Sequence, residues 1–289
     1  MSVLRWPAVK ILLLLLCLSL LISACSRAGL AYRNLDWLVP WRLNDYLNLD
    51  SQQQAWLKPR LQTHLQWHCS AELPRYIDWL KTTENILAQP QPDSAQLLEQ
   101  FAQFDAALKR IGIEITPTAI ELLPGLSEQQ VRELYAAMDE DNLEDRQDFL
   151  DPPLAIQISE RQTRMQERLR PWLGRLNSAQ TEHIATWANS LGEQNRLWLE
   201  NRQLWQAELR KVVAERDSAD FAERLTPLLQ QRERFYSDEY RASYGRSRQA
   251  LATLFSQLLS SSDKAQRERL SHRLRDLRRD LTEQQCDAA

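Results

Sequence analysis

The sequence predicts an all-α protein: a multi-helix bundle in which one long helix packs against C-terminal helices. Apolar residues recur at helical spacing along most of the chain, and residues typical of helix starts precede these segments. No alternating run of Val, Ile and Thr bounded by turn residues predicts a strand. With 10 Trp, 7 Tyr, 6 Phe and only 6 Gly in 289 residues, the composition excludes disordered and collagen-like chains.

Residues 1–24 are predicted to be a signal peptide. Arg5 and Lys10 precede an apolar run over 11–22, which is the right length for a signal-peptide core and short for a membrane-spanning helix. The small residues before Cys25 resemble the lipobox of bacterial lipoproteins, which predicts cleavage before Cys25 and acylation of its thiol. An uncleaved short anchor is the alternative. Acyl chains on Cys25 would hold the protein on a membrane without a transmembrane helix.

Localisation and partners follow from this signal. By resemblance to lipoprotein sorting, Ser26 in place of an aspartate favours the outer membrane, with the body facing the periplasm. Loss of residues 1–24 removes two basic residues and no acidic one, so the formal net charge of −3 becomes more negative. We therefore expect a membrane contact through Cys25, an envelope protein as partner, and no binding of nucleic acid.

Residues 25–49 form the predicted lipidated N-terminus and an aromatic-rich lead-in to a helical body at 50–289. The aromatic residues of the lead-in are Tyr32, Trp37, Trp41 and Tyr46. Two interpretations stay open. Such side chains favour a membrane interface, where one end of the ring is wet. Alternatively, the lead-in forms short helical turns that fold onto the body.

The first half of the body predicts helices separated by proline and glycine. A helix begins at Asp50, with Gln53 three residues on, and Pro59 kinks it or lies in its first turns. Further helices are expected at 73–87 and at 94–111, the latter ending at Gly112. A short helix is expected between Pro117 and Pro124. Two more are expected, one from Ser127 into the acidic stretch 139–151 and one from Pro153 to about 169.

A long helix over about 178–215 is the clearest prediction of the second half. Its apolar residues recur every seven positions, at Ile184, Leu191, Trp198, Trp205 and Val212. A helix of this length needs a partner, which the segments 218–260 and 263–281 supply. The expected core residues are Trp198 and Trp205 together with Leu225, Leu228, Leu229, Tyr236, Tyr240, Leu251, Leu254, Phe255 and Leu258.

A short signature recurs at 49–53, 126–130, 176–180 and 281–285. Each copy has a leucine, a capping residue and a glutamine three residues after the capping residue. This is a capping box with the leucine as a hydrophobic staple, so each copy mainly predicts a helix start. The pattern also resembles the Leu-Thr-x-x-Gln signature of Spy/CpxP-type periplasmic chaperones.

The four cysteines reduce to one candidate disulfide. Cys17 leaves with the signal peptide and Cys25 is acylated, so Cys69 and Cys286 remain as ordinary thiols in an oxidising compartment. A bridge between them would close a loop that the chain-entropy model values at roughly 4 to 5 kcal/mol. The alternative is two unrelated cysteines, because the sequence does not show that they approach each other.

The candidate metal ligands are His64, His68 and Glu72, which a continuous helix would place on one face. A packing role is the alternative, because Pro74 can end the helix early and no further histidine is near. No cofactor is expected, since the glycines are scattered singly and the chain has no GxSxG, HExxH or CxxC motif. The sequence therefore names no catalytic residue.

The stretch from Lys264 to Arg279 is strongly basic, with Glu268 and Asp276 as its acidic exceptions before Asp280. Such a stretch can meet an anionic lipid head group or an acidic partner. The alternative is a solvated helix face paired with neighbouring acids. The acidic stretch 139–151 is a candidate for that complement within the same molecule.

The residues at 31–37 (AYRNLDW), 46–49 (YLNL) and 65–76 (LQWHCSAELPRY) resemble an uncharacterised family of lipoproteins from Gram-negative bacteria. The resemblance implies an all-helical envelope lipoprotein and supplies no activity. Cys69 stands where that family's Trp-His pattern has a basic residue. This departure weakens a metal site borrowed from the motif and favours a disulfide peculiar to this chain.

We therefore expect a lipid-anchored periplasmic protein that acts by binding or scaffolding and is not an enzyme. A holdase-type chaperone is the first alternative, and it would need a concave, partly apolar face left uncovered. An enzyme of unknown type is the second, and it would need a deep pocket with converging polar groups.

Overall fold

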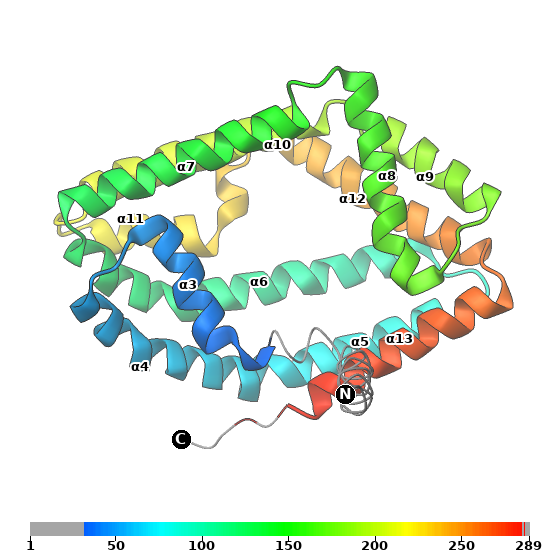
Figure 1. The fold of residues 1–289 in the computed structure, drawn as a ribbon, viewed down its shortest axis with the longest axis horizontal. Coiled ribbons are helices and arrows are strands. Elements are labelled where there is room, and N and C mark those ends of the chain that lie inside the picture. Colours follow the sequence, from blue (N-terminus) through cyan, green and yellow to red (C-terminus); the bar gives the residue numbers. More distant parts are fainter. Residues whose placement is uncertain (1–31, 285, 287–289) are drawn as a thin grey trace, which may run out of the picture.

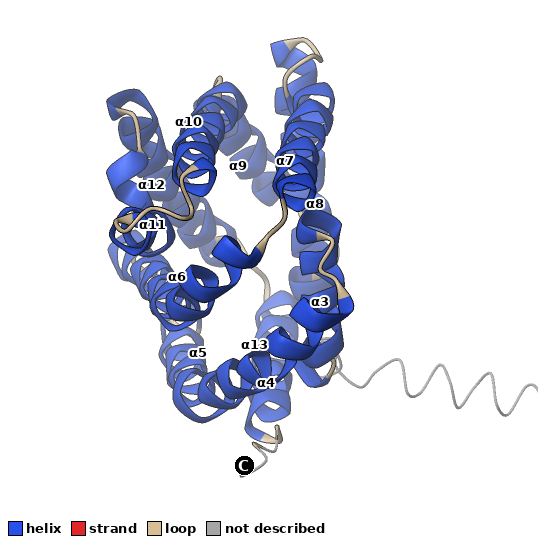
Figure 2. Ribbon diagram, turned by 90° about the vertical axis from the view of Figure 1, so that its left-hand side faces the viewer, coloured by secondary structure: helices blue, strands red, loops and turns tan. Residues whose placement is uncertain are grey.

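The computed structural model describes residues 32–284 and 286, and every regular element in them is a helix (Figures 1 and 2). The all-α prediction is confirmed. The predicted signal peptide, Cys25 and Ser26 lie outside the described residues. None of the helices in the described part of the chain combines the length and the apolar character that crossing a bilayer requires.

The elements follow one another with short connections. The first half comprises α3 (Leu35–Leu47), α4 (Ser51–Trp67), the π-helix η1 (His68–Glu72), α5 (Leu73–Leu87), α6 (Ser94–Leu122), the 3₁₀-helix η2 (Leu123–Gly125) and α7 (Glu128–Phe149). The second half comprises α8 (Leu154–Leu173), α9 (Ser178–Ser190), α10 (Gln194–Ala214), α11 (Phe221–Gln230), the 3₁₀-helix η3 (Arg232–Phe235), α12 (Asp238–Ser260) and α13 (Lys264–Thr282).

The helices are arranged along the edges of an elongated frame (Figure 1). Helices α7 and α10 run side by side along one long edge, while α4, α5 and α13 follow the opposite edge. Helix α6 runs between these edges and contacts α11 and α12. The lead-in helix α3 packs on α4 and α7, so its described part folds onto the body.

Buried apolar side chains gather in a separate core at each end of the frame. The first core joins α3, α4, α6, α7, α10 and α11, and its most buried members include Val213, Leu225 and Leu228. The second core joins α5, α8, α9, α12 and α13 around Ile184, Leu254 and Leu258. Each core is built from segments far apart in the sequence.

Helix α6 corrects the prediction of a helix that ends at Gly112. It continues through Gly112 and Pro117 to Leu122, so the expected short helix between Pro117 and Pro124 is its last part. Gly112 marks a close approach, because a Cβ there would lie 2.7 Å from the carbonyl oxygen of Leu229 on α11. This glycine therefore serves packing between helices and does not end one.

The predicted long helix over 178–215 is divided into α9 and α10. A turn separates them, and Gly192 in this turn has φ +49°, which favours glycine. The buried Arg161 of α8 donates to the carbonyl oxygens of Ala188 at 2.8 Å and Gly192 at 3.2 Å. These bonds satisfy carbonyl groups that a helix end leaves free. As predicted, both helices contact the C-terminal α12.

The capping boxes predicted at Asp50, Ser127 and Asn177 are confirmed. The copy at 281–285 is wrong as a helix start, because Thr282 is the last residue of α13. A further capping box, which the signature did not include, begins α13 with Asp263 as the N-cap residue.

The capping glutamines pair with one another across the fold. Gln53 and Gln130 exchange amide hydrogen bonds of 3.2 and 2.6 Å, which joins the starts of α4 and α7 in what we call the first junction. Gln180 and Gln266 exchange amide bonds of 3.0 Å in each direction, which joins the starts of α9 and α13 in the second junction. Each glutamine thus caps its own helix and bonds a distant one.

Candidate functional site

The C-terminal end of α4 carries the residues proposed from sequence as metal ligands. At this point the chain takes the π turn of η1 before α5 begins. A π turn holds more residues than an α turn. The spacing of His64, His68 and Glu72 therefore no longer places them on one face, and each has partners of its own.

His64 faces α6. Its Nδ1 lies 3.0 Å from Oε1 of Glu114 and its Nε2 lies 2.7 Å from Oγ1 of Thr118. Both ring nitrogens are therefore used within the protein.

His68 lies between two phenols. Its Nδ1 is 3.1 Å from the hydroxyl of Tyr32 and its Nε2 is 3.2 Å from the hydroxyl of Tyr76. Burial lowers the pKa of His68, an effect that the nearby Glu72 opposes. Burial and the neighbouring Tyr76 raise the pKa of Tyr32 to about 12. This arrangement favours a neutral imidazole held between neutral phenols.

Glu72 is fully buried and binds two arginines. Its oxygens accept from Nε and Nη2 of Arg110 at 2.8 Å each, and Arg75 adds a further bond. The hydrogen bonds from Arg110 lower the pKa of Glu72, against the opposing effect of burial. In the described part of the chain, no group of three His, Cys, Asp or Glu side chains is placed to hold a metal ion.

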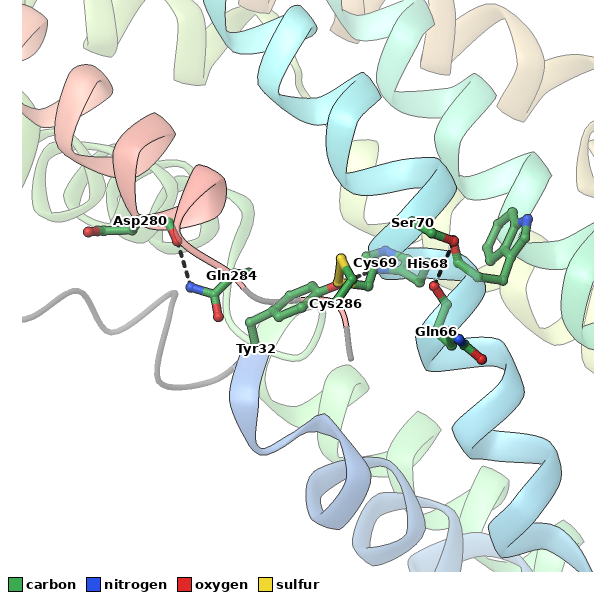
Figure 3. Close-up of a disulfide and its surroundings, with 9 residues drawn as sticks. Tyr32, Gln66, His68, Cys69, Ser70, Asp280, Gln284 and Cys286 are labelled. Atoms are coloured by element: carbon green, nitrogen blue, oxygen red, sulfur yellow. Dashed lines mark hydrogen bonds between the residues drawn. A yellow bond between two sulfur atoms is a disulfide. The ribbon is translucent and has the colours of Figure 1, made fainter. Parts of the chain in front are cut away.

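Cys69, also in η1, forms a disulfide with Cys286, and their Cα atoms lie 5.6 Å apart (Figure 3). The bond joins the end of α4 to the chain beyond α13, across a sequence separation of 217 residues. Figure 3 shows Tyr32 and His68 beside it. Since every candidate ligand here has an internal partner, we interpret this region as structural.

A concave site of about 350 Å³ lies between α3, α7, α10 and α12. We call it the aromatic–arginine pocket. Its lining residues are Tyr46, Met138, Asp141, Trp198, Asn201, Arg202, Trp205, Gln206, Arg232, Tyr236 and Tyr240. Aromatic faces combined with a few polar groups are typical of small-molecule sites.

The aromatic side chains of the pocket are held in place by their neighbours. The rings of Tyr236 and Tyr240 meet edge to face, with centroids 4.9 Å apart. Nε1 of Trp205 donates to the carbonyl oxygen of Leu228 at 3.0 Å. Burial and the nearby Tyr236 raise the pKa of Tyr240, so this phenol stays neutral near pH 7.

The polar wall of the pocket contains a paired arginine. Arg202 binds Asp145 and also Asp141, the latter at 3.3 Å. Tyr46 donates its hydroxyl to Asp141. Burial and this bond raise the pKa of Tyr46. The charge of Arg202 is therefore compensated within the protein.

Arg232 differs from Arg202, because its guanidinium forms no ion pair with a carboxylate in the described residues. Its Cζ lies 5.7 Å from the centroid of the Trp205 ring. Its donors are free to meet an acidic or hydroxyl group in the pocket.

Sequence reasoning missed this pocket, although it named several of its aromatic residues. It assigned Trp198, Trp205, Tyr236 and Tyr240 to the core. Trp205 does pack against the first core, but all four side chains are partly exposed and line the pocket. The sequence feature that could have indicated the pocket is the density of aromatic residues at heptad and helical spacing. Periodicity does not distinguish a filled core from a lined pocket.

The acidic stretch 139–151 does not complement the basic stretch at 264–279. Its acids pair mainly with α10, where Asp139 binds Arg210 at 2.6 Å and Arg202 binds Asp141 and Asp145. On α13, Arg278 binds Glu84 of α5 at 2.8 Å. The two stretches therefore have separate partners.

A sequence profile described as a family of unknown function (DUF6279) matches residues 45–241. The chain belongs to this family. No curated protein and no solved structure matches the chain. The DUF6279 range contains every lining residue of the aromatic–arginine pocket and excludes Cys286. Family membership thus supplies no activity, and the function must be argued from the pocket.

Proposed function

We propose that the protein is a lipid-anchored binding protein of the bacterial envelope that takes a saccharide into the aromatic–arginine pocket. One observation carries this proposal: Trp198, Trp205, Tyr236 and Tyr240 line a single concavity together with polar side chains. A sugar ring has apolar C–H faces and a rim of hydroxyl groups. Aromatic faces pack against the former, and amide and guanidinium groups bond the latter.

The charges of the pocket favour an acidic saccharide. Arg202 is compensated by Asp141 and Asp145, while Arg232 is not paired with a carboxylate in the described residues. A carboxylate or phosphate on the sugar would give Arg232 a charge-assisted partner. A volume of about 350 Å³ is at the small end for ligand sites, which suits one or two rings.

The proposed anchor is the acylated Cys25, on the outer membrane and facing the periplasm. The signal-like residues 1–24 and the lipobox resemblance support it. Trp37 and Trp41 support it too, since both lie shortly after Cys25 in the sequence, are exposed, and stack on α3 with ring centroids 5.9 Å apart. Exposed tryptophans favour a membrane interface. Incorporation of labelled palmitate that Cys25→Ala abolishes would test the anchor.

The ligand is tested by calorimetric titration of the full chain in detergent with uronic acids, amino sugars and neutral disaccharides. We expect the acidic saccharides to bind and Arg232→Gln to raise their Kd at least tenfold. Arg234→Gln is the matched control, because Arg234 lies on the same 3₁₀-helix but outside the pocket lining. Equal effects of the two variants, or no saccharide binding at millimolar concentration, would contradict the proposal.

A holdase-type chaperone is the second candidate function. A groove of about 740 Å³ between α5, α6 and α13 is lined by Trp79, Phe104, Leu108 and Leu277 among others. Phe104 and Leu108 are 56% and 48% exposed, which is the partly apolar face that this alternative needs. Its occupant would be an apolar segment of an unfolded chain. Suppression of aggregation that Phe104→Ser removes and Arg232→Gln preserves would support it.

A further inference from the structure

A second concavity of about 430 Å³ lies away from the aromatic–arginine pocket, where the C-terminal end of α8 and the turn before α9 meet α13. Three arginines line it: Arg170 of α8, Arg175 of the turn and Arg269 of α13. The uncharged Gln166 of α8 lines it too. We call it the arginine site.

The three guanidiniums are exposed and are not compensated. None of them forms an ion pair with a carboxylate in the described part of the chain, and acidic side chains are absent from the lining of the site. Other arginines of α13 are used internally. Arg278 binds Glu84, and Arg267 donates to main-chain oxygens that include those of Gln89 at 3.0 Å and Pro90 at 2.9 Å.

Two of these arginines are placed by contacts with neighbouring elements. Gly174 has φ +76°, and a Cβ there would lie 3.2 Å from Nε of Arg269, so the Arg269 side chain lies against this glycine. Arg175 follows Gly174 in this turn, and its carbonyl oxygen accepts a hydrogen bond of 2.8 Å from Gln266 of α13. The second junction therefore fixes the turn from which Arg175 extends.

Three like charges in one concavity repel one another, and a bound anion would relieve that repulsion. Guanidinium groups match the geometry of a phosphate, which accepts paired N–H bonds from each of them. The amide of Gln166, which forms no hydrogen bond within the described residues, adds a neutral donor.

We propose that the arginine site binds a phosphate group through Arg170, Arg175 and Arg269. The same chemistry is offered by a phosphodiester in a lipid head group and by a free phosphate or phosphomonoester. The site is independent of the saccharide proposal, because the two concavities share no lining residue.

The test is calorimetric titration of the full chain in detergent at constant ionic strength. The probes are inorganic phosphate, glycerol phosphate and glycerophosphoglycerol, the last being a soluble phosphodiester. Binding of any of them that depends on the arginine site supports the proposal. Tighter binding of the diester points to a lipid head group, and tighter binding of the others points to a free phosphate or monoester.

Matched variants distinguish specific phosphate binding at the arginine site from nonspecific electrostatic attraction of phosphate to basic side chains. We expect Arg269→Gln to raise the Kd at least tenfold and Arg273→Gln to change it less than twofold. Arg273 is the control because it is exposed on the same helix and lies outside the lining. Gln166→Leu, which leaves the net charge unchanged, should raise the Kd severalfold and serves if Arg269→Gln does not fold. Equal effects of the two arginine variants, or no binding at millimolar concentration, would overturn the proposal.

Discussion

The two glutamine junctions use the same chemistry in different surroundings. In both, a capping-box glutamine at one helix start exchanges amide bonds with its counterpart at another. At the first junction Gln130 is buried while Gln53 is partly exposed. At the second, Gln180 and Gln266 are 0% and 5% exposed. The glutamine pair is thus partly exposed at one end and fully buried at the other, where losing a bond costs more.

The two ends also share the way they hold the preceding chain. Gln130 donates to the carbonyl oxygen of Asn48 at 3.0 Å, two residues before the N-cap of α4. Gln266 donates in the same way to Arg175, two residues before the N-cap of α9. Helix α4 from the first junction and α13 from the second lead to the disulfide between Cys69 and Cys286. The comparison teaches that a local capping motif can also organise tertiary structure.

Removal of the disulfide should have the largest effect on the free energy of unfolding, because this bond couples the two ends of the frame. Replacing Cys69 and Cys286 by Ala frees a connection across 217 residues. The chain-entropy model assigns about 5 kcal/mol to closing such a loop. We expect the free energy of unfolding in urea to fall by several kcal/mol.

Hydrogen exchange measured by mass spectrometry would show whether the ends then separate. Peptides from α4 and α13 should lose protection before peptides from α7 and α10, since the bond joins only the former pair. An unfolding free energy within about 1 kcal/mol of the wild type would show that the bond does not couple the ends.

Substitution of the paired glutamines tests the difference in burial directly. Gln180→Leu removes the partner of Gln266 in a buried site, and we expect a loss of about 2 kcal/mol. Gln53→Leu at the partly exposed junction should cost about 1 kcal/mol, because water replaces the lost bonds. Urea unfolding of the two variants measures both values.

The corresponding double variants sharpen this test. Replacing Gln180 and Gln266 together by Leu should cost less than the sum of the single changes, since no amide is then left without its partner. Strict additivity at the second junction would show that the amide pair contributes nothing beyond capping. Equal losses in the single variants at the two junctions would show that burial does not change the contribution of the pair.

The pH dependence of stability is the smallest expected effect, and it reports on the place where the two ends are joined. The pKa of His68 is lowered in the folded protein from its usual 6.5. The unfolded chain therefore binds more protons in this range, and stability is full above pH 6.5 and falls as the pH drops through it. Urea unfolding at pH 7.5 and 5.5 measures this slope.

His68→Gln removes the titrating group and should flatten the dependence, whereas Tyr76→Phe keeps the imidazole and should retain it. Tyr76→Phe is a suitable control because it removes a partner of His68, the hydroxyl 3.2 Å from Nε2, without removing the imidazole. A slope that is unchanged in His68→Gln would assign the pH dependence to other groups.

Several features were predictable because they depend on neighbours in sequence. The capping boxes at Asp50, Ser127 and Asn177 follow from local hydrogen bonding and were predicted correctly. The helix end expected at Gly112 was predicted wrongly. A glycine in a helix can mark either the end of the helix or a close contact with a neighbour, and only the approach of Leu229 shows that Gly112 marks a contact. Likewise, the carbonyl oxygens at the break before α10 accept hydrogen bonds from Arg161, which comes from another helix.

The candidate sites were less predictable than the fold. Trp198 and Tyr240 show the same spacing whether they fill a core or line a pocket, so the sequence alone could not reveal the aromatic–arginine pocket. Arg269 and Arg278 are equally basic residues of one helix, yet only Arg278 meets a carboxylate in the described residues. Which charges stay uncompensated depends on what packs beside them.

The sequence by itself determined the helical class and most of the helix starts, because periodicity and capping are encoded within a few residues. It also determined the family, through the match over residues 45–241. Only the tertiary structure decided which glutamines pair, which arginines remain free and where the aromatic rings face a cavity. These properties arise from contacts between residues far apart in the chain, such as Gln180 with Gln266 and Gln266 with Arg175, and local spacing does not specify such contacts.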